Sequence, residues 1–238
     1  MKNKLKLYWL MPIRSILFLM FFMITSYCSN QELPALTKWW SIVACVVNIV
    51  MILIFVIIVQ KKKTNYRELI MYKKETKLSK ILIISFMMIL IGMGGMYMAG
   101  FVCYGQFPYL APMMIAPIPV FLSIFSIIVL PITTTLVEDG LYLGCGVNQI
   151  KTKWLAIVIP AFFYALQHSF IPTLFDGQFI IYRFLSFLPL TLMICYWYYY
   201  KRNPLPIMIG HTILNLATVT QIFIMSLKPE LYYQILNI

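Results

Sequence analysis

Long apolar runs alternate with short polar segments along the whole chain. About 20 apolar residues are enough to cross the hydrocarbon core of a bilayer as a helix. Strands of a membrane barrel would alternate over about ten residues, and these runs do not alternate. The pattern therefore predicts an all-α protein, a polytopic transmembrane helix bundle. We expect about seven spans, at approximately 15–28, 39–59, 81–103, 120–150, 154–171, 179–200 and 205–227.

Two stretches between the predicted spans are less regular. Four prolines lie within 105–119, which predicts an outer loop or a broken helix there. The wider stretch 105–150 leaves room for an eighth helix. The hydrophilic segment 60–80 fits two descriptions, an amphipathic helix at the membrane surface or a solvated cytoplasmic loop.

The charge of the chain fits a membrane protein and indicates its orientation. Charged residues make up 11% of the sequence, against about 25% in a typical soluble domain. With the N-terminus cytoplasmic, 16 of the 19 Lys and Arg residues fall on the cytoplasmic side, as the positive-inside rule requires. This count includes Lys2, Lys4, Lys6 and Arg14, which we place before the first span.

The same distribution bears on partners. The net charge of +12 would suit nucleic acid, but the basic residues lie between spans, so we expect no nucleic-acid partner. Contact with the anionic headgroups of a lipid bilayer is the simpler explanation. We therefore predict a multi-pass protein of the cell membrane. The five cysteines are scattered and form no C-x-x-C pair, so they indicate neither a disulfide framework nor a zinc finger.

A few polar residues interrupt the apolar runs. Glu138 and Asp139 lie in the fourth predicted span, and the only histidines, His168 and His211, lie in the fifth and seventh. A rise of about 1.5 Å per helical residue puts these groups at similar depths, and Asn215 shares a helix face with His211. An ionisable side chain inside a membrane is costly, so it indicates a functional site. We predict one polar site shared by three helices.

Each of these residues also has a simpler explanation. A single histidine or asparagine can bridge two helices by a hydrogen bond. The acid pair alone would suit the ion or proton site of a transporter, although the sequence has no inverted repeat to support one. Taken together, the residues favour a catalytic site over these simpler explanations.

Three motifs resemble those of the CAAX-protease and bacteriocin-processing family of intramembrane proteases, called CPBP or Abi. That family carries EExxxR, FxxxH and HxxxN or HxxxD, in this order. The matching positions are Glu138, Asp139 and Leu143, then Tyr164 and His168, then His211 and Asn215. The resemblance covers about 117–227. It makes 105–238 a CPBP-like catalytic helix bundle, preceded by N-terminal transmembrane helices and the basic loop in 1–104.

The resemblance implies an intramembrane endopeptidase that cuts a peptide or protein substrate near one terminus, in a cleft open to the cytosol. Glu138 would be the general base for a water held with His168. His211 and Asn215 would stabilise the oxyanion. These roles make physical sense, because a water needs a base within hydrogen-bond reach and an oxyanion needs donors aimed at it.

Metal dependence stays open at this point. Glu138, His168 and His211 are candidate ligands for Zn²⁺, since one carboxylate and two imidazoles suit this ion. The chain has no HExxH motif, however. We favour direct activation of water by a glutamate and a histidine, without a required cofactor.

The first motif departs from the family at Leu143, where arginine is expected to pair with the second acid. Leucine cannot form this pair, so Asp139 is either protonated or reached by Arg183 of the sixth span. Because the four presumed chemical residues persist, we predict an active enzyme. The alternative is an inactive CPBP-like binding or immunity protein.

Overall fold

The structure is a computed structural model that describes residues 7–73, 75–107, 109 and 111–236. Seven long helices carry the fold: α1 Ile13–Ser29, α3 Trp40–Lys62, α5 Leu78–Tyr104, α6 Val120–Asp139, α7 Lys153–His168, α8 Gly177–Lys201 and α9 Leu205–Leu227. Shorter elements connect them: η1 Leu7–Leu10, α2 Leu33–Leu36, η2 Thr37–Trp39, α4 Tyr66–Leu69, η3 Pro112–Met114, the π-helix η4 Gly140–Val147 and α10 Pro229–Leu236. No described residue forms a strand, so the prediction of an all-α bundle is confirmed.

Six helical segments within the described residues are long and apolar enough to cross a membrane. They correspond to six of the seven predicted spans, and the fourth consists of α6 continued by η4. The remaining span, predicted at 154–171, is α7, which has only 16 residues. Between α5 and α6 the described residues contain only the short η3, so they hold no eighth span. Pro108 lies outside the described residues.

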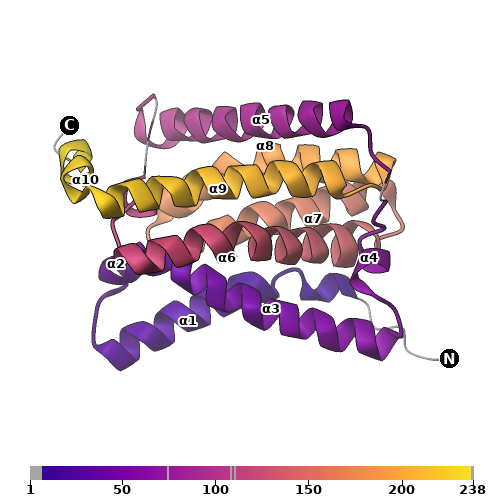
Figure 1. Cartoon of the computed structure of the whole chain (residues 1–238), viewed down its shortest axis with the longest axis horizontal. Coiled ribbons are helices and arrows are strands. Elements are labelled where there is room, and N and C mark those ends of the chain that lie inside the picture. Colours follow the sequence, from indigo (N-terminus) through magenta and orange to yellow (C-terminus); the bar gives the residue numbers. More distant parts are fainter. Residues whose placement is uncertain (1–6, 74, 108, 110, 237–238) are drawn as a thin grey trace.

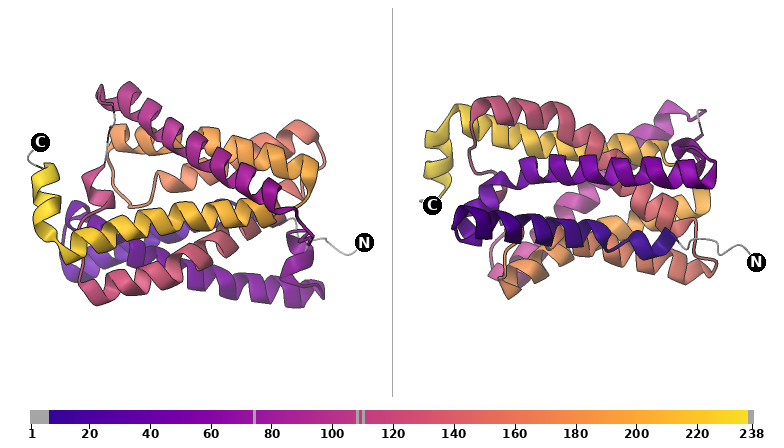
Figure 2. Two further views of the ribbon diagram at one scale, coloured as in Figure 1. Left: turned by 45° about the horizontal axis from the view of Figure 1, so that its top comes forward. Right: turned by 90° about the horizontal axis from the view of Figure 1, so that it is seen from below.

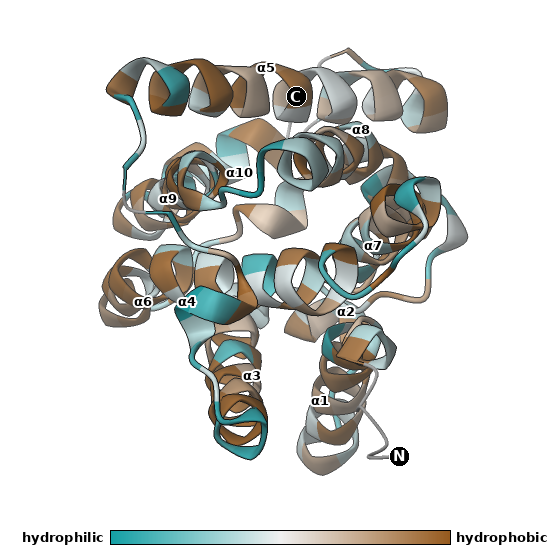
Figure 3. Ribbon diagram, turned by 90° about the vertical axis from the view of Figure 1, so that its right-hand side faces the viewer, coloured by the Kyte–Doolittle hydropathy of each residue, from teal (hydrophilic) through white to brown (hydrophobic). Residues whose placement is uncertain are grey.

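The long helices pack in successive layers (Figures 1 and 3). Helix α5 lies on one side of the molecule and packs on α8 and α9. These two pack in turn on α7 and α6, and α3 with α1 covers the opposite side. The polar residues of α6, α7 and α9 therefore face the inside of the bundle.

The two ends of the bundle differ in charge. At one end lie the start of α1, α4, and the connections from η4 to α7 and from α8 to α9 (Figure 1). We call it the basic end, because the segments there carry most of the Lys and Arg residues. Helix α10 and η3 lie at the other end, which we call the far end. Lys2, Lys4, Lys6 and Lys74 are outside the described residues.

Most described residues of the segment 60–80 are exposed, as in a solvated loop, but its middle is not. Between the end of α3 and the start of α5 the described residues form the single turn α4, whose last residue, Leu69, is buried together with Ile70 just after it. The Tyr66 hydroxyl donates to the carbonyl of Leu136 in α6. Asn148 donates to the Leu69 carbonyl at 2.9 Å, and the Tyr198 hydroxyl donates to the Ile70 carbonyl at 2.9 Å. The middle of the loop is thus inserted against the basic end, because its apolar residues find a partner there.

Two glycines make this insertion possible. A Cβ atom at Gly140 would lie 2.9 Å from the Phe55 and Tyr66 rings, and one at Gly144 would lie 2.9 Å from Leu69. The G-x-x-x-G spacing predicts a close helix contact here. The contact exists, and its partners are α3, α4 and the residues just after α4.

Candidate active site

The site is built around Glu138, in the last turn of α6. Its side chain is 1% exposed, and its two oxygens face different partners. His211 Nε2 from α9 lies 3.3 Å from Oε2, and His168 Nε2 from the last turn of α7 lies 3.9 Å from the same atom. The structure therefore brings together three residues from three separate motifs, as the depth argument predicted.

Arg14 contacts the other oxygen of this carboxylate. Its Nη1 atom lies 2.6 Å from Glu138 Oε1, and the arginine is 1% exposed. The prediction that Arg14 lies before the first span as a cytoplasmic charge is wrong. The apolar segment begins at Leu7, so Arg14 lies inside it and points into the bundle.

Two amides hold the guanidinium in place. Arg14 donates to Gln167 Oε1 at 2.6 Å, and it donates to Asn48 Oδ1 from Nη2 at 3.0 Å and from Nε at 3.3 Å. Asn48 in turn donates to Thr134 at 2.8 Å. The Tyr142 hydroxyl donates to Gln167 at 3.0 Å. A buried charge is tolerated only when paired and hydrogen-bonded, and this arginine is both.

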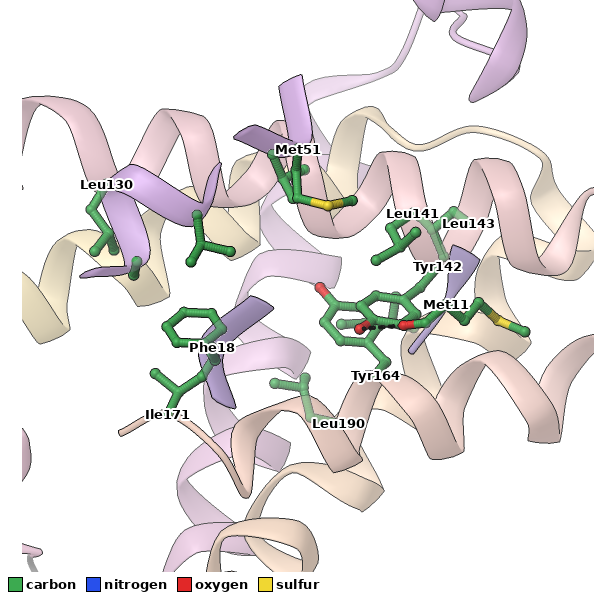
Figure 4. Packing of buried hydrophobic residues seen from close by; sticks show 14 of the residues in the cluster. Met11, Phe18, Met51, Leu130, Leu141, Tyr142, Leu143, Tyr164, Ile171 and Leu190 are labelled. Atoms are coloured by element: carbon green, nitrogen blue, oxygen red, sulfur yellow. Dashed lines mark hydrogen bonds between the residues drawn. The ribbon is translucent and has the colours of Figure 1, made fainter. Parts of the chain in front are cut away.

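Asp139 has partners of its own. Its Oδ1 atom lies 3.5 Å from His211 Nδ1 and accepts from the Tyr164 hydroxyl at 3.4 Å. The same hydroxyl lies 3.1 Å from His211 Nδ1. Asp139 and Tyr164 therefore fix the ring of His211 so that Nε2 faces Glu138. The Tyr164 ring stacks on Tyr142, with centroids 4.4 Å apart, within the packed core (Figure 4).

Arg183 does not reach Asp139, so the expected replacement for the motif arginine is not found in this residue. Arg183 instead donates to the carbonyls of His168 at 3.3 Å and Ile171 at 3.2 Å. Helix α7 ends at His168, which leaves carbonyl groups without helical partners, and the guanidinium supplies donors to two of the carbonyls there. The His168 ring also stacks on Phe187 at 3.6 Å between centroids.

A cavity of about 550 Å³ adjoins the cluster. Glu138, His168, His211 and Asn215 all line it, and so does Arg14. Glu138 Oε2 and Asn215 Nδ2 are buried without a hydrogen-bond partner. Buried polar atoms are almost always satisfied, so these two atoms at the cavity are available to a bound molecule.

Residues 119–217 match the Rce1-like family, described as type II CAAX prenyl endopeptidase Rce1-like. The match contains all three motifs and begins just before α6. It confirms the resemblance read from the motifs. Comparison with curated proteins and with solved structures gave no match. The family indicates peptidase activity in general, in a protein with helices that can span a membrane.

The Rce1-like segment does not contain the arginine that contacts Glu138. Leu143 occupies the motif position and is fully buried in η4. Figure 4 shows it beside Leu141 and Tyr142 within the apolar core. The guanidinium at the acid pair comes from α1, outside the matched residues.

The donor atoms around Glu138 are of the types that bind a metal ion, but their surroundings disfavour one. Two imidazoles and a carboxylate suit Zn²⁺. The guanidinium of Arg14 already lies 2.6 Å from the same carboxylate, however, and would repel a dication at its other oxygen. Among the described residues, no group of three or more His, Cys, Asp or Glu has the arrangement of a metal site.

Sequence reasoning missed Arg14, Asn48 and Gln167. Each is a polar residue within an apolar run, which was the signal that identified Glu138 and the histidines. Arg14 was misread because arginines near the end of a span usually belong to its flank. Asn48 and Gln167 belong to no motif of the family.

Proposed function

We propose that the protein is an intramembrane endopeptidase that cleaves a peptide or protein substrate near one terminus with a water activated by Glu138. The observation that carries this proposal is the convergence of His168 and His211 on Glu138 Oε2 at one boundary of a cavity inside an apolar bundle. The Rce1-like match of residues 119–217 supports it.

In the proposed reaction, a water lies between Glu138 Oε2 and His168 Nε2. Glu138 takes a proton from this water as the oxygen attacks the carbonyl carbon of the substrate. The carboxylate is suited to this role because Arg14 occupies Oε1, which leaves Oε2, beside the two imidazoles, to face the water. Glu138 then gives the proton to the leaving amine, and the peptide bond breaks into a carboxylate and an amine.

The oxyanion formed in this step needs donors. Asn215 Nδ2 is buried, unpaired and lines the cavity, so it is available to an oxyanion. His211 with both ring nitrogens protonated would donate toward Asp139 through Nδ1 and present Nε2–H at the cavity. This assignment uses Asp139 and Tyr164 as positioning residues, since both contact His211 Nδ1.

We propose that no metal is required, because the Arg14 guanidinium already neutralises the carboxylate that would bind one. The measurement is the zinc content of purified protein, with cleavage assayed after dialysis against a chelator. Activity retained without bound metal supports direct activation of water. Activity that disappears on dialysis and returns with Zn²⁺ overturns it.

We also propose a location in the cell membrane with the basic end in contact with anionic headgroups. The short segments there carry clusters of Lys and Arg, which attract such lipids. The absence of a nucleic-acid partner stays a prediction, made from the same distribution.

The test of the proposed function is cleavage of a reporter peptide library by purified protein in proteoliposomes. We expect cleavage by the unaltered chain and loss of it in Glu138→Ala and in His168→Ala. A matched control is Glu32→Ala, which removes an exposed acid at the N-cap of α2. Cutting by both site variants at the rate of the unaltered protein would refute the assignment.

Two other functions make different predictions. An inactive binding or immunity protein would keep its cellular phenotype in Glu138→Ala. A transporter would show flux in proteoliposomes that Asp139→Asn abolishes.

A further inference from the structure

The cavity extends from the candidate site in one direction only. Helices α5 to α9 each contribute more than one residue to its wall. In each helix, the lining residue nearest the basic end lies close to the level of the catalytic cluster. These residues are Ile89, Glu138, Tyr164, Ile194 and His211. Every other lining residue of these helices lies toward the far end. Trp40 of α3 and Met114 of η3 belong to the wall at that end.

The basic end is closed in the part of the chain that the structure describes. All residues of η4, which follows Glu138, are buried, and the loop after α4 is hydrogen-bonded against them. A second hollow of about 270 Å³ lies there, but its lining contains no residue of the site. The family resemblance implied a cleft open at this end, and the structure puts the cavity on the other side of the cluster.

The cavity reaches the surface between α5 and α9. These helices touch near the basic end, where a Cβ atom at Gly210 would lie 2.7 Å from Met88 Sδ. Beyond that point α5 diverges from α9 and follows α8 (Figure 2, left). Met93 of α5 and Ile213 of α9 both line the cavity and are 44% and 43% exposed. The opening therefore lies on the side of the bundle that faces lipid.

The residues of the wall indicate what kind of ligand the cavity can bind. Among the described residues, its charged side chains apart from the histidines are Arg14, Glu138 and Arg183. The rest of the wall consists of apolar, aromatic and uncharged polar residues. A volume of about 550 Å³ falls in the range of roughly 300–1,000 Å³ that encloses an organic ligand. An apolar ligand lying in the bilayer matches this wall and its lateral opening.

We propose that the cavity binds an apolar peptide segment lying in the half of the bilayer away from the basic end, and that the segment enters sideways between α5 and α9. With the basic end cytoplasmic, the substrate is an exported or membrane-inserted peptide cut on the non-cytoplasmic side. Cutting rests on the proposed function, whereas binding and access do not.

The experiment measures labelling of single cysteines by a membrane-impermeant maleimide. The background carries Cys28→Ser and Cys103→Ser and keeps the three buried cysteines. Thr218→Cys reports on the cavity, and Lys228→Cys, at the far end of the same helix, is the matched control, because it is exposed but does not line the cavity. Lys61→Cys reports on the basic end.

In intact cells we expect Thr218→Cys to react and Lys61→Cys to react only after the cells are opened. In proteoliposomes, a synthetic apolar peptide at about ten times its Kd should slow labelling of Thr218→Cys roughly tenfold and leave Lys228→Cys unchanged. The same peptide with its central residues replaced by lysine should not protect. The protection is also measured with Glu138→Gln present, so its outcome is independent of catalysis.

Labelling of Thr218→Cys only in opened cells would overturn the proposed side of access. Equal protection of both cysteines, or of neither, would overturn the proposed binding site. Protection without any cleavage by the unaltered protein would leave this site in place and refute the proposed function.

Discussion

At the scale of single residues, the pairing of Arg14 with Glu138 has the largest consequences for the site. Both side chains are almost fully buried, and a lone charge in such a place costs far more than a paired one. The pair therefore has two consequences. It pairs the carboxylate of the proposed general base with a cation, and it makes the stability of the bundle depend on both partners.

The first prediction concerns this pair. Arg14→Met leaves the Glu138 carboxylate buried without its partner, so we expect a loss of about 3–5 kcal/mol in the free energy of unfolding. Arg14→Met combined with Glu138→Gln removes both charges and should regain most of that stability without regaining activity. Unfolding in detergent, followed by helical circular dichroism, measures this. Additive losses in the double variant would contradict the coupling.

Tyr164 shows how one departure from the family motifs relates to another. The family has phenylalanine at this position, and here the tyrosine hydroxyl contacts both Asp139 and His211. Leu143 cannot provide Asp139 with the arginine expected of the motif. The two departures therefore complement each other, since the hydroxyl supplies a polar partner to the acid.

The second prediction follows from this arrangement. Tyr164→Phe restores the family motif, yet we expect it to lower kcat roughly fivefold, because a hydrogen bond to the positioned imidazole is worth about 1 kcal/mol. KM should change little, as expected for a residue that acts through His211. Tyr97→Phe, on another wall of the same cavity, is the control. A Tyr164→Phe enzyme with unaltered kcat would show that the hydroxyl has no positioning role.

Among the elements, α7 is shorter than a full span, and this affects the site. It ends at His168, so a side chain of the proposed catalytic cluster lies at a helix terminus, inside the bundle. In lipid the exposed carbonyls of such a terminus need internal donors. Arg183 of α8 provides them for His168 and Ile171, which explains a buried arginine that forms no ion pair within the described cluster.

Helix α5 packs closely on α8 through one of two adjacent glycines. A Cβ atom at Gly95 would lie 2.5 Å from the Ser186 carbonyl oxygen, whereas one at Gly94 would have no atom within 4 Å. The two positions share a helix and differ only in what they face. They provide a matched pair for testing the packing that forms one wall of the cavity.

The third prediction uses this pair. Gly95→Ala must push α5 from α8, and overpacking of this kind costs about 1–3 kcal/mol. Gly94→Ala should be neutral or should stabilise the helix by up to about 1 kcal/mol, because alanine is the better helix former. Thermal unfolding of both variants in the same detergent is the measurement. Equal melting temperatures would mean that α5 does not pack on α8 as described.

For the whole molecule, the helices could be predicted because apolar runs of this length have few alternatives in a membrane. Glu138, His168 and His211 could also be brought together from depth alone, since each lies inside such a run. The pattern does not show in which direction around the helix axis a side chain near the end of a span points. The sequence therefore does not show that Arg14 points into the bundle, and it suggests the wrong partner for Arg183.

Contacts between segments that are far apart in the chain could also not be predicted from the sequence. The insertion of Leu69 and Ile70 against η4 depends on two glycines that lie about seventy residues further on. The short length of α7 depends on carbonyl groups satisfied by a residue of the next helix. The division of the chain at 104 and 105 stays a prediction, although Arg14 of α1 contacts Glu138 across it.

The most direct test of the account is the turnover number of Glu138→Gln in proteoliposomes, on a reporter peptide that the unaltered protein cleaves. Glutamine keeps the shape of the side chain and its contact oxygen for Arg14, but it cannot accept the proton of the attacking water. General base catalysis contributes about 10²–10⁴-fold, so we predict that kcat falls by at least about a hundredfold while the variant stays folded. A folded Glu138→Gln protein with the kcat of the unaltered chain would contradict the account.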